Sequence, residues 1–246
     1  MEDAVKREFD NKIKRLTKSR AYLDFCEEAY GYRMYLFNMT DKAQLDFIFR
    51  EIPLDAADTV LDLGCGCGSI LNALTKQSGC AGVGLDRLDS GDVALHSPSA
   101  SYIHGDMDDL AAYRLQPTVT LCVDSLYFVR DLQKLLRQLC AVPHNRLYLF
   151  YSQYLFEESA ADAQTLRAER TTLACALNAC GVSYQTIDYS ENERRLYEAS
   201  LRALEKRAGA FEKEGNLDLY QEKRKETLLG QTLYDTGRAS RYLYLC

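Results

Sequence analysis

Val60-Leu-Asp-Leu-Gly-Cys-Gly-Cys-Gly68 is the stretch that decides the fold of this chain. A short apolar run ends at Asp62 and leads directly into three alternating glycines, and the apolar spacing of Ser69–Gln77 behind them is typical of a helix. Glycines let the backbone turn sharply and let a ligand approach the main chain without interference from a Cβ atom. A helix that begins there presents free N–H groups and the positive end of its dipole. The stretch therefore predicts a buried strand, a ligand-binding turn and a helix.

Short apolar runs alternate with helical patterns on both sides of this stretch. The runs predict strands at Thr59–Leu63, Cys80–Leu85, Ser101–His104, Val119–Val123 and Arg146–Tyr151. Helical spacing recurs between them, notably at Asp131–Ala141, and a helix at 163–180 is followed by further strands at Val182–Asp188 and Arg241–Cys246. Near-continuous apolar strands that alternate with helices are typical of a parallel sheet covered on both faces. We therefore expect a doubly wound α/β fold.

Each of the first four predicted strands ends in a carboxylate. The four acids are Asp62, Asp86, Asp106 and Asp124. In a doubly wound sheet such strand ends lie along one edge, beside the crevice where ligands bind. Four acids there suit a ligand with hydroxyl groups, an exocyclic amine and a positive charge. An aspartate after a strand also often caps the next helix, and for Asp124 taken alone that interpretation is equally good.

The stretch from Thr59 to Asp131 resembles the class I S-adenosylmethionine-dependent methyltransferases. Val60–Gly68 matches their first motif, where the backbone faces the methionine part of the cofactor, and Asp86 stands where their acidic residue holds the ribose hydroxyls. Gly105-Asp106-Met107 matches the segment that contacts adenine, and Asp124-Ser-Leu-Tyr-Phe-Val129 resembles the segment beside the transferred methyl group. Phe25–Tyr32 and Phe211–Asn216, with Arg241–Tyr244, look similar to a bacterial group of small-molecule methyltransferases.

The resemblance implies a Rossmann-like sheet of seven mostly parallel strands, the last one antiparallel, with a helical cap. It implies S-adenosylmethionine as cofactor, S-adenosylhomocysteine as product and no metal. The residues it assigns to the cofactor are Asp62, Gly64, Cys65, Gly66, Gly68, Asp86, Arg87, Asp106, Met107 and Asp124. The sequence departs from the family between Asp86 and Ser101, where Gly91 and Pro98 shorten or break the expected helix.

Tyrosines are the candidates for the methyl-transfer centre. The chain has 17 of them, and aromatic rings stabilise cations that lie within about 6 Å of the ring centroid. We expect Tyr30 and Tyr127 to border the centre as catalytic residues; Tyr127 follows the fourth strand, at the ligand-binding edge. The alternative is that the N-terminal tyrosines only pack a helical cap onto the sheet.

The flanking segments divide the chain into a core and its additions. Residues 1–55 form the predicted N-terminal helical cap, with a helix over 2–30 and a second one opened by a capping box at Asp41–Gln44. Residues 56–189 form the cofactor-binding core. Residues 190–236 are a helical insertion, a lid or a partner surface: a capping box at Ser190–Glu193 opens a charged helix to about Glu214, and a second helix runs through Leu228. Residues 237–246 contain the last strand of the core sheet.

Composition excludes several classes of protein. The formal net charge of −6 repels phosphate backbones, so nucleic acid is a poor partner. Nine cysteines without a CxxC pattern, and only three histidines, predict neither a disulfide framework nor a zinc site, and favour a reducing cytoplasm. We interpret Cys65-x-Cys67 and His104 as packed residues. The chain shows no signal peptide, and no run approaches the roughly 18 apolar residues of a membrane span.

The sequence therefore predicts an enzyme that transfers a methyl group to a small molecule, at nitrogen or oxygen. The family's Asn/Asp-Pro-Pro-Tyr motif for nucleobase amines is absent after the fourth strand, which also disfavours DNA and RNA substrates. A non-catalytic methyltransferase-like domain, which binds the cofactor or a partner protein, is the alternative from another class. A nicotinamide-dependent oxidoreductase is disfavoured because the glycines have GxGxG spacing instead of GxGxxG. An oligomer formed through the helical insertion is compatible with the sequence.

Overall fold

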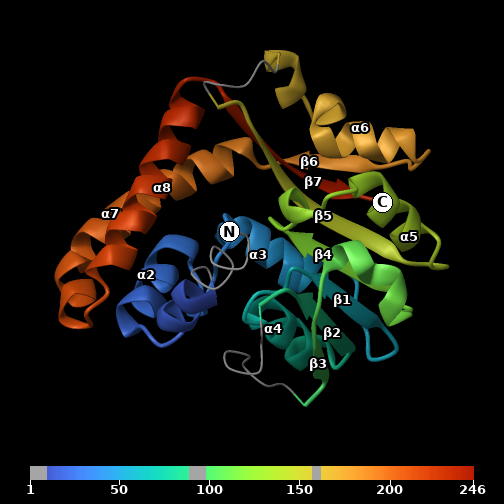
Figure 1. Ribbon diagram of the computed structural model, residues 1–246, viewed down its shortest axis with the longest axis horizontal. Coiled ribbons are helices and arrows are strands. Elements are labelled where there is room, and N and C mark those ends of the chain that lie inside the picture. The colour runs from blue at the N-terminus through green and yellow to red at the C-terminus, as the bar shows by residue number, and fades with distance from the viewer. Residues whose placement is uncertain (1–9, 89–97, 157–161) are drawn as a thin grey trace.

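A seven-stranded sheet forms the centre of the computed structural model, which describes residues 10–88, 98–156 and 162–246. The strand order is β3-β2-β1-β4-β5-β7-β6 (Figure 1). The strands are β1 (Thr59–Leu63), β2 (Ala81–Asp86), β3 (Ala100–His104), β4 (Val119–Val123), β5 (Arg146–Tyr154), β6 (Gln185–Asp188) and β7 (Ala239–Leu245). Only β7 runs antiparallel to its neighbours, β5 and β6. The predicted Rossmann-like sheet of seven mostly parallel strands is confirmed.

Helices cover both faces of the sheet because successive strand residues point to opposite sides. In β1, Val60 packs into one core with α4 (Ser69–Ser78), and Leu61 and Leu63 pack into the other core with α5 (Leu132–Cys140). The 3₁₀ segment η3 (Met107–Tyr113) and α6 (Thr172–Ala179) also cover the second face. Nearly continuous burial along β1 and β4 explains why these strands read as apolar runs.

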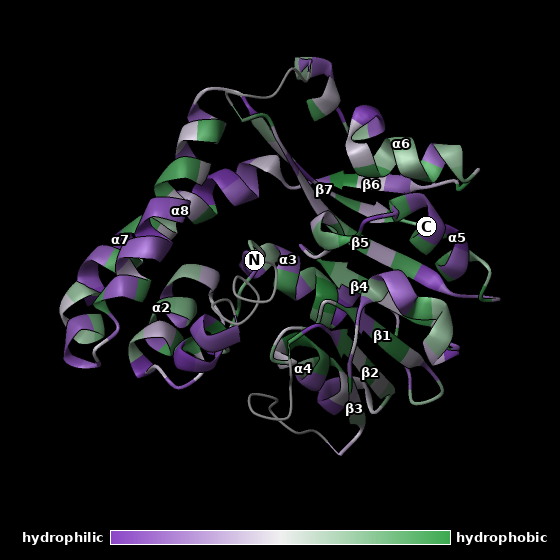
Figure 2. Cartoon of the chain, viewed as in Figure 1, coloured by the Kyte–Doolittle hydropathy of each residue, from purple (hydrophilic) through white to green (hydrophobic). Residues whose placement is uncertain are grey.

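A helical cap lies beside the sheet, on the side where the parallel strands end (Figure 1). It contains a helical segment over residues 10–16, α2 (Arg20–Tyr30), α3 (Lys42–Asp46), the π-turn η1 (Phe47–Glu51), α7 (Ser190–Lys213) and α8 (Leu217–Asp235). The long helices α7 and α8 pack against each other, and α2 packs against α7. Figure 2 shows hydrophobic and hydrophilic residues interleaved along both long helices, as expected of helices with one packed face.

Two predicted helix starts have different outcomes. Asp41 caps α3 as expected, since its side chain accepts a hydrogen bond from the Gln44 amide. The predicted capping box at Ser190–Glu193 is wrong. Tyr189 is the N-cap residue of α7 and makes no side-chain capping bond, while the Ser190 hydroxyl bonds to the Arg241 carbonyl and Glu193 is buried.

The lengths of three predicted helices also need correction. The helix predicted over 2–30 is interrupted after residue 16, and Ser19 caps a new helix there by accepting a hydrogen bond from the Tyr22 amide; residues 1–9 lie outside the described residues. The helix predicted over 163–180 consists of two 3₁₀ turns, η5 (Ala163–Leu166) and η6 (Ala168–Arg170), before α6 begins. The helix α8 continues beyond Leu228 to Asp235. The break predicted between Asp86 and Ser101 falls largely on residues 89–97, which are also outside the described residues.

Candidate functional site

The glycine turn after β1 lies at the carboxyl edge of the sheet. Gly64 has a φ of 73°, and a Cβ atom there would lie 2.2 Å from the Ser125 Cβ, so the turn and the segment after β4 approach too closely for any side chain. Gly66 differs. Its φ is 55°, and the nearest described atom to a Cβ there is Phe37 Cδ2, at 3.9 Å. The backbone at Gly66 therefore faces a space that a side chain would fill.

Two aspartates lie against this turn and have opposite environments. Asp86 accepts hydrogen bonds from the Gly66 and Leu88 amides, each at 2.7 Å, so it fixes the shape of the turn. Asp62 is 3% exposed, and within residues 10–88, 98–156 and 162–246 no donor is hydrogen-bonded to its carboxylate. Burial, with a smaller contribution from Asp86, raises the pKa of Asp62 to about 7. Burial also raises the pKa of Asp86. Among the described residues, Asp62 is therefore a buried acid without a cationic partner.

The raised pKa of Asp62 predicts how stability changes with pH. In the unfolded chain this carboxyl titrates near its ordinary value of 3.8, and in the folded chain near 7. The protonated form is therefore favoured by folding, and its stabilising contribution is complete below pH 4 and is lost as the pH rises to about 7. Chemical denaturation from pH 4 to 8 should show the wild type losing stability relative to Asp62→Asn across this window. A constant difference between the two proteins would contradict the assignment.

The two cysteines of the turn are packed residues, as predicted. Burial raises the pKa of the Cys65 thiol well above its ordinary value, so it remains protonated. The Cys67 thiol lies 3.2 Å from the Ser69 hydroxyl and donates to the Tyr35 carbonyl. Over the described ranges no group of three metal-ligating side chains occurs.

The acid after β3 serves a local structural role. The Asp106 side chain caps η3 by accepting a hydrogen bond from the Asp108 amide, and it lies 3.8 Å from Arg87 and 3.5 Å from Arg130. Met107 is 6% exposed and packs in the core, so its side chain does not project from the edge. His104 is the last residue of β3 and is exposed, so its interpretation as a packed residue is wrong.

Asp124 follows β4 in a left-handed conformation, with a φ of 55°. It does not cap a helix; its carboxylate accepts two hydrogen bonds from the Arg241 guanidinium, at 2.7 and 3.1 Å, and one from the Met39 amide at 2.8 Å. Arg241 lies on β7 with no exposed surface and also donates to Gln44 and Ser152. The interpretation of Asp124 as a capping residue is therefore wrong. Its assignment as a cofactor-binding residue stays a prediction; the carboxylate itself is engaged by Arg241 and the Met39 amide.

Glu193, at the start of α7, completes a buried network with this pair. It has no exposed surface and accepts hydrogen bonds from the hydroxyls of Ser152 at 2.9 Å, Tyr154 at 2.6 Å and Tyr234. Its carboxylate lies 3.6 Å from the Arg241 guanidinium. Burial raises the pKa of Glu193 above its ordinary value, although Arg241 and the hydroxyls oppose that shift. We call Asp124, Arg241, Glu193 and their hydroxyl partners the buried network.

The two predicted catalytic tyrosines lie in different surroundings. Tyr127 is 40% exposed and lies at the edge of the buried network: its hydroxyl accepts a hydrogen bond from the Ser152 amide at 2.6 Å and lies 3.3 Å from Asp124. Tyr30 has no exposed surface and packs edge-on against Phe25, at 5.7 Å between ring centroids. Tyr30 therefore belongs to the interior of the cap, as the alternative interpretation of the N-terminal tyrosines holds.

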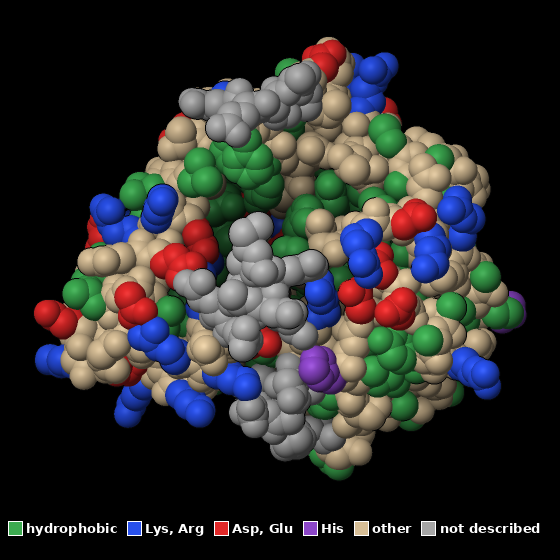
Figure 3. Space-filling model, in the orientation of Figure 1, with side chains coloured by type: hydrophobic (Ala, Val, Ile, Leu, Met, Phe, Trp, Pro, Cys, Tyr) green, Lys and Arg blue, Asp and Glu red, His purple; other side chains and the backbone are tan. Residues whose placement is uncertain are grey.

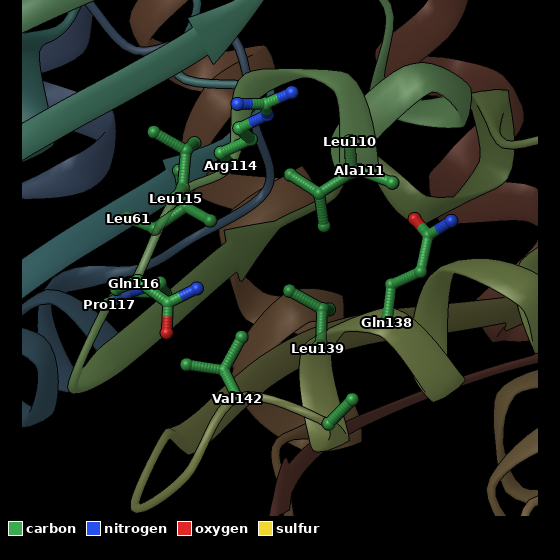
Figure 4. A pocket seen from close by; sticks show the side chains of 11 residues that line it. Leu61, Leu110, Ala111, Arg114, Leu115, Gln116, Pro117, Gln138, Leu139 and Val142 are labelled. Carbon is green, nitrogen blue, oxygen red and sulfur yellow. The ribbon is translucent and has the colours of Figure 1, made fainter.

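A hollow opens between the helical cap and the sheet, and hydrophobic side chains line its visible depth (Figure 3). Three large hydrophobic side chains remain exposed just after β4 and β5, the strands that end on this side of the sheet; they are Tyr127, Phe128 and Phe156. A separate cavity of about 260 Å³ lies between η3 and α5 (Figure 4). Its lining is mostly aliphatic and contains no predicted site residue.

Comparisons with known proteins identify the fold. No model of a protein family matches the chain, and no curated protein matches it either. A phosphoethanolamine N-methyltransferase 2 of Haemonchus contortus, solved with phosphomonomethylethanolamine and S-adenosylhomocysteine, has a TM-score of 0.70 at 13% identity, covering 95% of this chain and 59% of that one. The chain therefore spans less than two thirds of that structure's length.

Two bacterial structures match over nearly their whole length. The cyclopropane synthase MmaA2 of Mycobacterium tuberculosis has a TM-score of 0.68 at 13% identity, covering 96% of this chain and 97% of that one. An S-adenosylmethionine-dependent methyltransferase of Geobacter sulfurreducens, solved with S-adenosylhomocysteine, has a TM-score of 0.57 at 14% identity, covering 90% and 96%. The chain has the fold of the class I S-adenosylmethionine-dependent methyltransferases, as the resemblance of its glycine turn implied.

Proposed function

We propose that this chain is an enzyme that binds S-adenosylmethionine at the glycine turn and transfers its methyl group to a small molecule, at nitrogen or oxygen. One observation carries the proposal. The carboxylate of Asp62 is buried without a partner among the described residues, directly beside a turn where a Cβ atom on Gly66 would come no closer than 3.9 Å to a described atom. An uncompensated buried carboxylate is costly, and the cationic amino group of the cofactor's methionine part would compensate it.

The residues around the turn fit the cofactor group by group. The backbone of Gly64–Gly68 would hold the methionine part, with Gly68 at the N-terminus of α4. Asp86 would accept from the ribose hydroxyls, and Asp106, Met107 and Arg87 would border adenine, Met107 through its backbone. Cys65 would contribute only its backbone, since its thiol packs against Gly84.

The cofactor supplies an activated methyl group on a sulfonium. The protein's own residues would hold the acceptor in line with that methyl carbon, and orientation of this kind is worth on the order of 7–11 kcal/mol of barrier. The cap residue Phe37 lies over Gly66, and the Tyr35 carbonyl bonds to Cys67, so the segment between α2 and α3 excludes water from the turn. Tyr127 would border the acceptor from the other side.

Other features support the finer parts of the proposal. The net charge of −6 disfavours a nucleic acid partner. All nine cysteines are free thiols, which favours the cytoplasm. Within the described part of the chain, no helix combines the length and the apolar character needed to cross a bilayer. The insertion 190–236 supplies Glu193 to the buried network, so we propose that it serves as a wall or lid of the acceptor site; a role as an oligomer surface is the alternative.

Cofactor binding can be tested without an acceptor. Asp86→Asn should weaken the binding of S-adenosylhomocysteine about 10- to 100-fold in isothermal titration, because a charged acceptor of ribose hydroxyl bonds is lost. Asp235→Asn, an exposed substitution at the end of α8, makes the same chemical change and should have no effect. Wild-type affinity in Asp86→Asn, or tighter binding of NAD than of S-adenosylhomocysteine by the wild type, would refute the proposal. Cofactor binding with no methyl acceptor in any metabolite pool would favour the non-catalytic alternative.

A further inference from the structure

The buried network carries more negative than positive charge. Two carboxylates, Asp124 and Glu193, share the single guanidinium of Arg241. Both close guanidinium hydrogen bonds to a carboxylate go to Asp124, and Glu193 remains at 3.6 Å. Among the described residues, Arg241 is the cation that acts on Glu193, and Asp124 is the acid that opposes it. With both carboxyl groups ionised, one negative charge is left over in a network where Arg241 and Glu193 are fully buried and Asp124 is 12% exposed.

The hydrogen-bond pattern favours Glu193 as the carrier of this charge. The Ser152 hydroxyl already accepts a bond from Arg241, so its own proton is free to go to Glu193. Tyr154 and Tyr234 donate their hydroxyl protons to the same carboxylate, and the Tyr197 hydroxyl lies 3.0 Å from that of Tyr154. Hydroxyl donors at both oxygens favour the ionised form and oppose the burial that raises the pKa of Glu193.

The network reaches the surface through aromatic residues. Tyr154 and Tyr234 are only partly buried, and the Tyr154 ring lies 6.1 Å from that of Phe156, which is 49% exposed. Tyr127 connects the network to Phe128, which is 65% exposed, with their rings 6.4 Å apart. Exposed aromatic rings in front of a buried negative charge are the combination that binds organic cations.

Two buried hydroxyls extend this polar region into the cap. Among the described residues, Tyr30 Oη and Ser200 Oγ have no hydrogen-bond partner. Ser200 lies on the same face of α7 as Glu193, two helical turns away. The Tyr197 hydroxyl is close enough to Tyr30 to contribute to the raised pKa of the latter. Polar atoms without partners are uncommon in protein interiors, and their position along this face suits a polar ligand.

We propose that the methyl acceptor is a small organic cation, such as an amine bound as its ammonium form, and that Glu193 sets this specificity by supplying the uncompensated negative charge beneath an aromatic rim of Tyr127, Tyr154 and Phe156. This inference rests on the proposed function. It concerns binding of the charged group and leaves open which acceptor atom receives the methyl group. Glu193 is a specificity residue, which acts through its charge and through the tyrosine hydroxyls that it orients.

A pair of isosteric probes tests the charge requirement. Choline and 3,3-dimethylbutan-1-ol have the same shape, and they differ in having a charged nitrogen or a neutral carbon at the branch point. With protein saturated in S-adenosylhomocysteine, isothermal titration should show at least a tenfold preference for choline in the wild type. Glu193→Gln keeps the shape of the side chain and one acceptor oxygen but removes the charge, and should abolish the preference. Glu191→Gln, an exposed change on the same helix, should leave it intact.

The remaining outcomes are decisive in different ways. If S-adenosylhomocysteine does not bind to the wild type, the proposed function itself is overturned. Normal saturation with no choline preference overturns only the present inference. The sulfonium of S-adenosylmethionine is the other positive charge that Glu193 could attract. If Glu193→Gln lowers the affinity for S-adenosylmethionine tenfold more than the affinity for S-adenosylhomocysteine, which has an uncharged thioether, and leaves the choline preference unchanged, Glu193 serves the cofactor. The inference then fails. Tyr234→Phe, which keeps the carboxylate, should retain the choline preference even if Glu193→Gln folds poorly.

Discussion

Arg241→Met should lower the free energy of unfolding by about 3–5 kcal/mol, the cost typical of breaking a buried ion pair by removing one partner. Methionine replaces the aliphatic part of the arginine side chain but leaves Asp124 and Glu193 without their cation. It also removes the hydrogen bonds that the guanidinium donates to the side chains of Gln44 and Ser152. Denaturant titration followed by circular dichroism would measure the change.

Two further variants serve as a control and as a partial rescue for this measurement. Arg195→Met removes an arginine whose side chain is 72% exposed and paired with Glu191, so it should change stability by less than about 1 kcal/mol. Combining Arg241→Met with Asp124→Asn removes one of the stranded charges, and asparagine tolerates the left-handed conformation at this position. The double variant should recover part of the lost stability. Equal stability of Arg241→Met and the wild type would show that the network does not hold the cap onto the sheet.

Gly66→Val should reduce affinity for S-adenosylhomocysteine by at least about 100-fold while the protein remains folded. Among the described residues, a Cβ atom there meets only the Phe37 ring, at 3.9 Å, so we expect the main cost to be the strain of a left-handed residue, about 1–2 kcal/mol. The same side chain fills the space that the cofactor would need. Isothermal titration and thermal unfolding of one sample separate the two effects.

Gly64→Val is the contrasting variant. Its Cβ would lie 2.2 Å from the Ser125 Cβ, so the segment after β4 must move, and we expect poor folding instead of a folded protein without ligand affinity. If Gly66→Val bound S-adenosylhomocysteine as the wild type does, the cofactor would have to lie away from the glycine turn.

The parts of the fold that were predictable depend on local chemistry. Glycines with positive φ mark the turn after β1, and apolar runs mark strands buried on both faces. The start of α3 was predictable from Asp41 because its capping hydrogen bond joins residues only three positions apart. The break at Ser19 was missed because the apolar spacing continues across it, and only the capping hydroxyl signals the new helix.

The buried network was not predicted, because its partners are far apart in sequence. Arg241 lies 117 positions from Asp124 and 197 from Gln44. A signal was nevertheless present: Arg241 alternates with Leu243 on the core-facing side of β7, and Glu193 stands in the stripe of Leu196, Ser200 and Leu204. A charged residue at a core position was the indication of a buried ion pair, and for Glu193 the capping motif gave a competing interpretation.

The position of β7 between β5 and β6 has a consequence for how the molecule acquires its structure. The helices α7 and α8 are neighbours in sequence and can pair through contacts of short range, whereas β6 joins the sheet only through β7. Pairings between distant segments close long loops and are slow compared with the pairing of adjacent helices. We therefore expect the charge centre at Arg241, on the last strand of the chain, to assemble after the helical pair has formed.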